Sequence, residues 1–205
     1  MGIGNRRVGL LVVLALFATS AACTAGGQAR TKIQIGEKMA AFTLPDVANG
    51  QPRSLDEFKG KKAVVVIFIA TQCPYSNAFT GVMARLAREY AGRGVAFVGV
   101  NANKTEPTAE VAEHARSHNL GFPVLKDESN VLADRLGARV TPEVFLLDSD
   151  WTLRYHGALG GSHHPTTDPA QASDEEVRPA LDAVLAGQTV ATTETKAFGC
   201  TIKRM

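Results

Sequence analysis

The feature that most constrains the fold is a continuous apolar run at residues 63–70. Most of its residues are β-branched or aromatic, and none is polar. A strand with one face in water alternates apolar and polar residues, whereas a strand covered on both faces is apolar throughout. The run therefore predicts the central strand of an α/β sheet with helices on both faces.

The segments around this run alternate between strand-like and helix-like patterns. Residues 79–91 carry apolar side chains at helical spacing, and residues 95–100 form a second apolar strand. Further strands are expected at residues 41–44, 122–125, 144–148 and 151–156, and further helices at 54–58, 108–118, 131–136 and 174–185. Two strand–helix units followed by two antiparallel strands and a helix predict a mixed central sheet.

The N-terminus has the layout of a secretory signal. Arg6 and Arg7 precede an apolar run at residues 9–18, and small residues follow at 19–22. The apolar run is short for a membrane span. The predicted organisation is a signal at 1–23, a polar linker at 24–34, one domain at 35–187 and a tail at 188–205. We therefore expect an exported protein, in the periplasm or anchored to a membrane and facing away from the cytoplasm.

Cys23 ends the small-residue stretch, where bacterial lipoproteins carry their lipidated cysteine. Ser20 stands three residues before it, where the lipoprotein pattern prefers leucine. The sequence leaves two outcomes open: Cys23 is lipidated and anchors the chain, or it is discarded with the signal. In both cases the mature domain retains two thiols available for disulfide chemistry, Cys73 and Cys200. Two thiols are too few for a disulfide-rich scaffold.

The charge balance argues against a nucleic-acid partner. The 205 residues have a formal net charge of +2, with acidic and basic residues mixed along the chain. Nucleic-acid binding needs a clustered basic surface, which this pattern does not provide.

Cys73 is the main candidate for a reactive group. It lies between the apolar strand and a predicted helix, and Pro74 favours the first helical turn. Amide groups and the helix dipole at such a position stabilise a thiolate and lower the pKa of a cysteine from about 8.5 to roughly 3.5–7.5. We predict a nucleophile that ionises readily at neutral pH. The alternative is a buried, inert thiol.

Several motifs together resemble those of the redoxin branch of the thioredoxin superfamily. The redoxins in question are peroxiredoxin-like, of the alkyl hydroperoxide reductase–thiol-specific antioxidant type. The motifs are Gly36-Glu37, Phe42-Thr43-Leu44-Pro45-Asp46, Phe58-Lys59-Gly60-Lys61, Ala70-Thr71-Gln72-Cys73-Pro74 and the segment from Thr141-Pro142 to Asp148. The resemblance implies a thioredoxin fold. It also implies that the peptide bond before Pro142 is cis and that Pro142 faces Cys73. The backbone of Thr141 would then hold an extended substrate chain.

The chain departs from the thioredoxin pattern at the second cysteine of the Cys-x-x-Cys motif. Ser76 stands there, in a Cys-Pro-Tyr-Ser sequence, and Gln72 replaces the tryptophan before the first cysteine. Ser76 could hydrogen-bond a Cys73 thiolate but could not resolve a mixed disulfide. The candidate resolving thiol is Cys200, in a Gly-Cys-x-Ile-Lys tail similar to that of some bacterial redoxins. A permanent Cys73–Cys200 bridge is the alternative.

Three functions remain open at this stage. A thiol–disulfide oxidoreductase would act on protein disulfides, and a thiol peroxidase would act on peroxides; both would need an external thiol reductant. Ala70 and Pro142 depart from the residues that typical peroxiredoxins carry at those positions. The third function is a non-catalytic binding module, which Ser76 favours. We expect no cofactor and no metal site, because Cys73 has no second cysteine close by.

Overall fold

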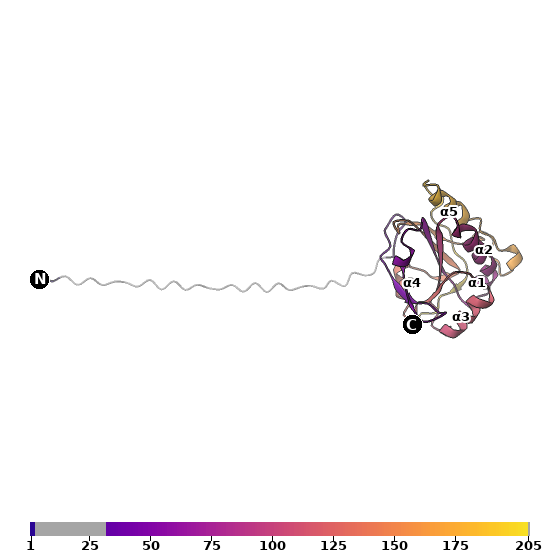
Figure 1. Cartoon of the computed structure of the whole chain (residues 1–205), viewed down its shortest axis with the longest axis horizontal. Helices are drawn as coiled ribbons and strands as arrows, with labels where there is room; N and C mark the ends of the chain where they lie inside the picture. Colours follow the sequence, from indigo (N-terminus) through magenta and orange to yellow (C-terminus); the bar gives the residue numbers. More distant parts are fainter. Residues whose placement is uncertain (3–31, 205) are drawn as a thin grey trace.

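The computed structural model describes residues 1–2 and 32–204. The predicted signal segment, Cys23 and most of the predicted linker lie outside the described residues. The remaining chain forms a sheet with helices on both faces (Figure 1).

A five-stranded mixed sheet forms the centre of the domain, in the order β5–β4–β3–β7–β8. Its strands are β3 (Ala63–Phe68), β4 (Val95–Asn101), β5 (Val124–Lys126), β7 (Glu143–Asp148) and β8 (Leu153–Gly157). β3 pairs parallel with β4 and antiparallel with β7. Every residue of β3 is buried, so the prediction of a central strand covered on both faces is confirmed.

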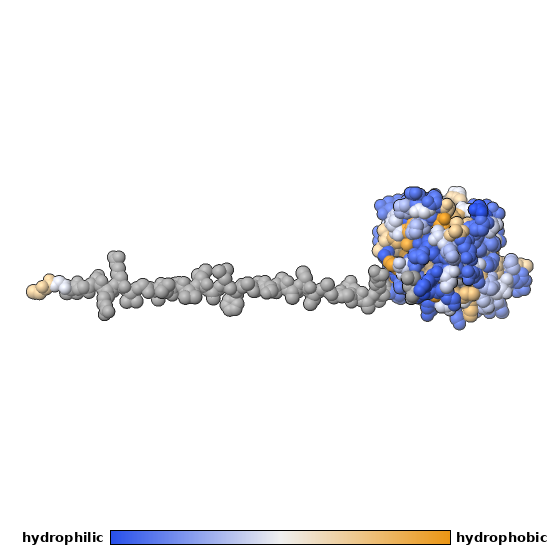
Figure 2. Space-filling model, turned by 90° about the horizontal axis from the view of Figure 1, so that it is seen from below, coloured by the Kyte–Doolittle hydropathy of each residue, from blue (hydrophilic) through white to orange (hydrophobic). Residues whose placement is uncertain are grey.

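Alternate residues of β3 contribute to two separate apolar cores. Val65 and Ile67 pack with Leu86 and Leu181 on one face of the sheet. On the other face the even-numbered residues of β3 pack with Leu132 and with residues of the N-terminal segment. The helices thereby cover both faces (Figure 1), and the surface in Figure 2 is largely hydrophilic with small apolar spots.

The structure has a helix or 3-10 turn at each of the five positions where the sequence pattern predicted a helix, and two more that it did not predict, α1 and η2. They are α1 (Pro74–Ala78), α2 (Thr80–Ala91), α3 (Thr108–Ser117), α4 (Val131–Leu136), α5 (Val177–Leu185) and two 3-10 turns, η1 (Leu55–Phe58) and η2 (Pro169–Gln171). The helix expected at residues 79–91 is preceded by α1, which starts directly after Cys73. Apolar periodicity could not reveal α1, because it consists of Pro-Tyr-Ser-Asn-Ala.

Two short strand pairs complete the fold. β1 (Thr43–Pro45) pairs with β2 (Pro52–Ser54), and β6 (Val140–Thr141) pairs with β9 (Cys200–Thr201). The second pair joins the tail to the segment before Pro142. Since each of these two strands is only two residues long, neither has a recognisable period in the sequence.

The tail is bound to the domain on both sides of β9. Upstream, the amide of Thr195 donates to the carbonyl of His156 at 3.1 Å, and the side chain of Thr195 accepts from the amide of Ala158 at 3.0 Å. Downstream, the amide of Ile202 donates to the carbonyl of Arg139 at 2.9 Å, and the Ile202 side chain is 3% exposed. Cys200 is thus fixed within a docked segment.

Candidate active site

Cys73 occupies the position directly before the first turn of α1. Its backbone is extended, with φ −94° and ψ 113°, and Pro74 begins the helix. The amide of Ser76 points back and donates to the Cys73 sulfur at 3.4 Å. The side chain of Cys73 is only 1% exposed, so the sulfur lies under other residues.

The segment around Pro142 forms one wall of the site. The Thr141–Pro142 bond is cis, as the resemblance predicted. The thiol of Cys73 donates to the carbonyl oxygen of Thr141 at 3.1 Å. Cys73 and Thr141, which are distant in sequence, are therefore in direct contact.

Cys200 forms the second wall. In the β6–β9 pair Cys200 is the register partner of Thr141. Its amide donates to the Cys73 sulfur at 3.4 Å, across 127 positions of the chain. The Cys73 sulfur thus receives two amide hydrogens, from Ser76 and from Cys200, and such donors stabilise a thiolate.

The close approach of the tail depends on Gly199. A Cβ atom at this position would lie 1.8 Å from the carbonyl oxygen of Thr141 and 2.6 Å from its carbonyl carbon. No side chain fits in that space. The glycine of the Gly-Cys pair therefore permits Cys200 to reach Cys73.

The two thiols have different surroundings. Cys73 is buried and Cys200 is partly exposed. Burial, together with a hydrogen bond to Cys73 and the charge of Cys73, raises the pKa of the Cys200 thiol to about 11. At neutral pH the Cys200 thiol is therefore protonated in the dithiol form, and it becomes a nucleophile only after its proton is removed.

Ser76 contacts the end of β3 through its side chain. Its side chain is fully buried, and its hydroxyl oxygen accepts the amide hydrogen of Ala70 at 3.1 Å. The hydroxyl thus ties the end of β3 to α1, while the backbone amide of Ser76 makes the contact with the Cys73 sulfur.

A buried glutamate holds the residues that precede Cys73, and the sequence analysis did not find it. The Glu106 carboxylate accepts from the amides of Thr71 at 2.9 Å and Gln72 at 3.0 Å. Glu106 is 2% exposed and also accepts from the side-chain amide of Asn101 at 2.5 Å. The signal available was its position, because polar residues that follow a buried strand gather at the carboxyl edge of the sheet.

A second buried carboxylate, that of Glu143, holds the residues that precede Pro142. Glu143 is 3% exposed and accepts from the amides of Arg139 at 2.6 Å and Val140 at 3.1 Å. Its other oxygen lies 2.6 Å from Nε2 of His156. Burial alone would raise the pKa of Glu143, but the hydrogen bonds from His156 and the two amides lower it below its usual value.

Aromatic and proline side chains line a small hollow beside α1 and the cis-proline segment. Its lining includes Tyr75, Phe79, Pro142 and Phe198, which come from α1, the cis-proline segment and the tail. The hollow is too small to hold a cofactor, but it offers an apolar contact between α1, the cis-proline segment and the tail.

Across residues 1–2 and 32–204, no cluster of three or more histidine, cysteine or acidic side chains has an arrangement that could bind a metal ion. In the same residues no helix has the length and apolar character needed to cross a bilayer.

The chain is similar to known thiol proteins. The sequence pattern of the AhpC/TSA family matches residues 35–156, which is more than half of the chain. The thiol-disulfide oxidoreductase ResA of Halalkalibacterium halodurans is 32% identical over 119 residues, which cover 58% of this chain and 65% of that protein. Peroxiredoxin Q of Sedum lineare is 28% identical over 130 residues, which cover 60% of this chain and 68% of that protein.

Solved structures match over a greater length of the chain. A hypothetical protein of Sinorhizobium meliloti 1021 has a TM-score of 0.75 and 36% identity, covering 85% of this chain and 97% of that one. A thiol:disulfide interchange protein DsbE of Chlorobium tepidum, at 22% identity and a TM-score of 0.60, shares the fold over 75% of this chain and 99% of its own.

The fold and the family match together define a thioredoxin-fold redoxin. Within that class, the chain belongs to the AhpC/TSA family.

Proposed function

We propose that this protein is an exported thiol–disulfide oxidoreductase that works with an internal pair of thiols, Cys73 and Cys200. The observation that carries the proposal is the β6–β9 pairing, which directs the Cys200 amide to the Cys73 sulfur at 3.4 Å. The likeness to a thiol-disulfide oxidoreductase supports the same chemistry. No cofactor is needed, because the two thiols carry both electrons.

In the first half of the cycle the dithiol form reduces a partner disulfide. For this step the tail moves off the Cys73 sulfur, which is 1% exposed while β9 is docked. The Cys73 thiolate then attacks one sulfur of the partner, a mixed disulfide forms, and the other partner sulfur leaves as a thiolate. Cys200, once deprotonated, then attacks the Cys73 sulfur and releases the second partner thiolate. The products are a Cys73–Cys200 disulfide and a reduced partner, so two electrons have moved to the partner.

In the second half an external thiol restores the dithiol. Thiolates attack a disulfide along the extension of the sulfur–sulfur bond. That direction is enclosed for Cys73, which is 1% exposed, and is more open for the partly exposed Cys200. The reductant therefore bonds to Cys200 and Cys73 leaves as a thiolate, favoured by the amides of Ser76 and Cys200.

The cis-proline segment and the hollow beside it would bind the partner chain. β9 occupies the Thr141 edge in this structure, so Thr141 would offer its backbone groups to a partner chain after the tail moves away. Pro142 and Tyr75 line the apolar hollow. An extended peptide gains backbone hydrogen bonds and a side-chain contact from such an arrangement.

Export rests on the sequence of the N-terminal residues. Arg6, Arg7 and the apolar run at 9–18 support a secretory signal that is removed at or near Cys23. If Cys23 is retained as the first residue and lipidated, the domain is tethered to a membrane.

Mild oxidation of the purified mature protein tests the proposal. Peptide mapping should find a Cys73–Cys200 disulfide in the monomer, and Cys200→Ser should accumulate mixed disulfides at Cys73. If both thiols stay reduced in the presence of disulfide and peroxide, the proposal fails and a non-catalytic binding module is the better description. A bridge that resists excess reductant identifies a structural disulfide instead.

A thiol peroxidase is the second candidate, favoured by the burial of Cys73 at 1% exposure, which suits a small oxidant. The Cys73 thiolate would take one peroxide oxygen to become a sulfenic acid and release an alcohol or water. The Cys200 thiol would condense with it, giving the same disulfide and water. The rates of oxidation by hydrogen peroxide and by a peptide disulfide, compared on one preparation, decide between the two substrates.

A further inference from the structure

One loop contacts both thiol-bearing segments of the protein. It begins at Asn101, the last residue of β4, runs to Glu106 and leads into α3. We propose that this loop is a clamp that sets the distance between Cys73 and Cys200, and that Glu106, Asn103 and Lys126 are its positioning residues. The inference rests on the proposed function in one respect: it assumes that Cys73 and Cys200 form a disulfide with each other.

The Cys73 side of the clamp consists of the Glu106 carboxylate. One oxygen accepts the amide of Thr71 and the other accepts the amide of Gln72, at 2.9 Å and 3.0 Å. These are the two residues directly before Cys73, so the carboxylate fixes the entry to the cysteine. Hydrogen bonds to an ionised acceptor are roughly twice as strong as neutral ones.

The tail side of the clamp consists of two backbone-directed contacts to Lys203. The side-chain oxygen of Asn103 accepts the amide of Lys203 at 2.7 Å. The amide of Lys104 donates to the carbonyl of Lys203 at 2.8 Å. Lys203 lies three residues after Cys200, so the same loop also sets the distance between β9 and Cys73.

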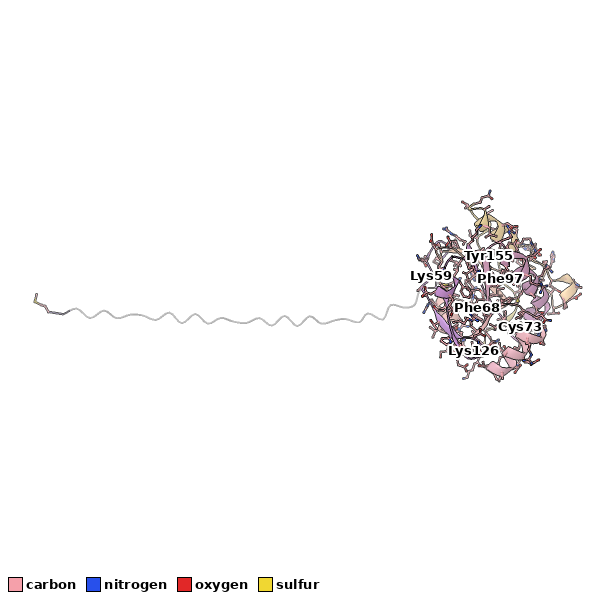
Figure 3. The ribbon with its side chains drawn as sticks, in the orientation of Figure 1. Lys59, Phe68, Cys73, Phe97, Lys126 and Tyr155 are labelled. Atoms are coloured by element: carbon pink, nitrogen blue, oxygen red, sulfur yellow. The ribbon has the colours of Figure 1, made fainter. Side chains whose placement is uncertain are left out.

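Lys126 joins the two sides. Its Nζ donates to the side-chain oxygen of Asn101 at 2.8 Å, the carbonyl of Asn103 at 2.7 Å and the carbonyl of Glu106 at 2.6 Å. An ammonium group has three hydrogens, and each has an acceptor in the loop. Lys126 and Cys73 lie in the half of the domain that carries α3 and the C-terminus (Figure 3).

Packing alone does not explain a lysine at this position. Lys126 is 3% exposed, and burying an ammonium group is unfavourable unless all its hydrogens are bonded. An apolar side chain of similar volume would fill the space without that penalty. The ammonium instead holds three oxygens of one loop in a single arrangement. Because this loop contacts the segments on both sides, a fixed loop also fixes the spacing of the two thiols. Its burial also lowers the pKa of Lys126, against the pull of nearby carboxylates.

The equilibrium between the protein dithiol and oxidised glutathione measures this spacing. Each protein disulfide formed releases two molecules of reduced glutathione, and the equilibrium constant reports the effective concentration of Cys200 at Cys73. We expect Asn103→Ala and Glu106→Gln each to lower the constant by about two- to tenfold, the range of one net hydrogen bond. Lys126→Met, which releases both sides, should lower it more than either.

A destabilised control separates positioning from general loss of structure. Leu181→Ala removes apolar contacts of α5, in a core cluster to which none of the clamp residues belongs. It should lower the melting temperature and leave the glutathione equilibrium unchanged. Equal constants in wild type and all three clamp variants, or an equal fall in Leu181→Ala, would overturn the proposal.

Amide hydrogen exchange measures how firmly the clamp holds each segment, and it needs no oxidation of the thiols. In reduced Lys126→Met the amides of Thr71, Gln72 and Lys203 should all exchange faster, whereas Asn103→Ala should affect Lys203 and spare the other two. Exchange in Lys126→Met that speeds up on one side alone contradicts a shared clamp. A wild-type chain that forms no internal disulfide contradicts the proposed function, and the exchange result then decides the clamp by itself.

Discussion

Replacing Gly199 by alanine should separate the two thiols while the domain stays folded. The added Cβ would lie 1.8 Å from the carbonyl oxygen of Thr141, and real Cβ contacts essentially never fall below 3.0 Å. The strand must therefore retreat by about 1.2 Å. The Cys200 amide lies 3.4 Å from the Cys73 sulfur, and a retreat of about 1.2 Å takes it beyond hydrogen-bond reach of that sulfur.

The expected effect on chemistry is large, because a misplacement of about 1 Å can slow a positioned reaction by about a hundredfold. The closing of the mixed disulfide between Cys73 and glutathione should slow by that order. The effect on stability is smaller. Losing the β6–β9 hydrogen bonds, at about 0.5–1.5 kcal/mol each, lowers the melting temperature by a few degrees in a domain of this size.

Acid quenching at timed intervals, followed by mass spectrometry, measures the closing step directly. Gly92→Ala is the matched control, because Gly92 is exposed, has a right-handed helical backbone and has open space around its Cβ position. It should close at the wild-type rate. If Gly199→Ala also closes at the wild-type rate, β9 does not deliver Cys200 to Cys73, and the argument from close approach is refuted.

Three further predictions follow from the site and the N-terminus. Cys73→Ser should lower the pKa of the Cys200 thiol from about 11, because the charge of Cys73 and a hydrogen bond to it add to the effect of burial. The pH dependence of Cys200 alkylation measures this pKa. An unchanged pKa would mean that the two thiols do not interact. Glu143 has a folded pKa below its unfolded value near 4.5, so its contribution to stability is present above that pH and is lost as the pH falls through the folded pKa. Denaturation of Glu143→Gln should accordingly show a weaker loss of stability in acid than wild type; parallel curves would count against the assignment. Mass spectrometry of the mature protein should find an N-terminus at or near Cys23, and an intact Met1 would exclude export by cleavage.

The sequence was sufficient for the fold class and for one end of the site. The apolar run at residues 63–70 could only be a strand covered on both faces, because a one-sided strand would alternate. Cys73 and Pro74 identified the strand-to-helix junction, since proline suits the first position of a helix. These conclusions depend on neighbours in the chain, which a sequence displays directly.

The other components of the site were decided by tertiary structure. Cys200 was a candidate because of its residue type, but only the β6–β9 pairing brought it to Thr141 and Cys73. The same holds for Glu106 and Lys126, whose contacts in the clamp join residues 20–35 positions apart. A single sequence reports residue types and local spacing. It does not report which buried polar groups satisfy one another across the sheet edge, because those contacts form only when the packed chain excludes water from them.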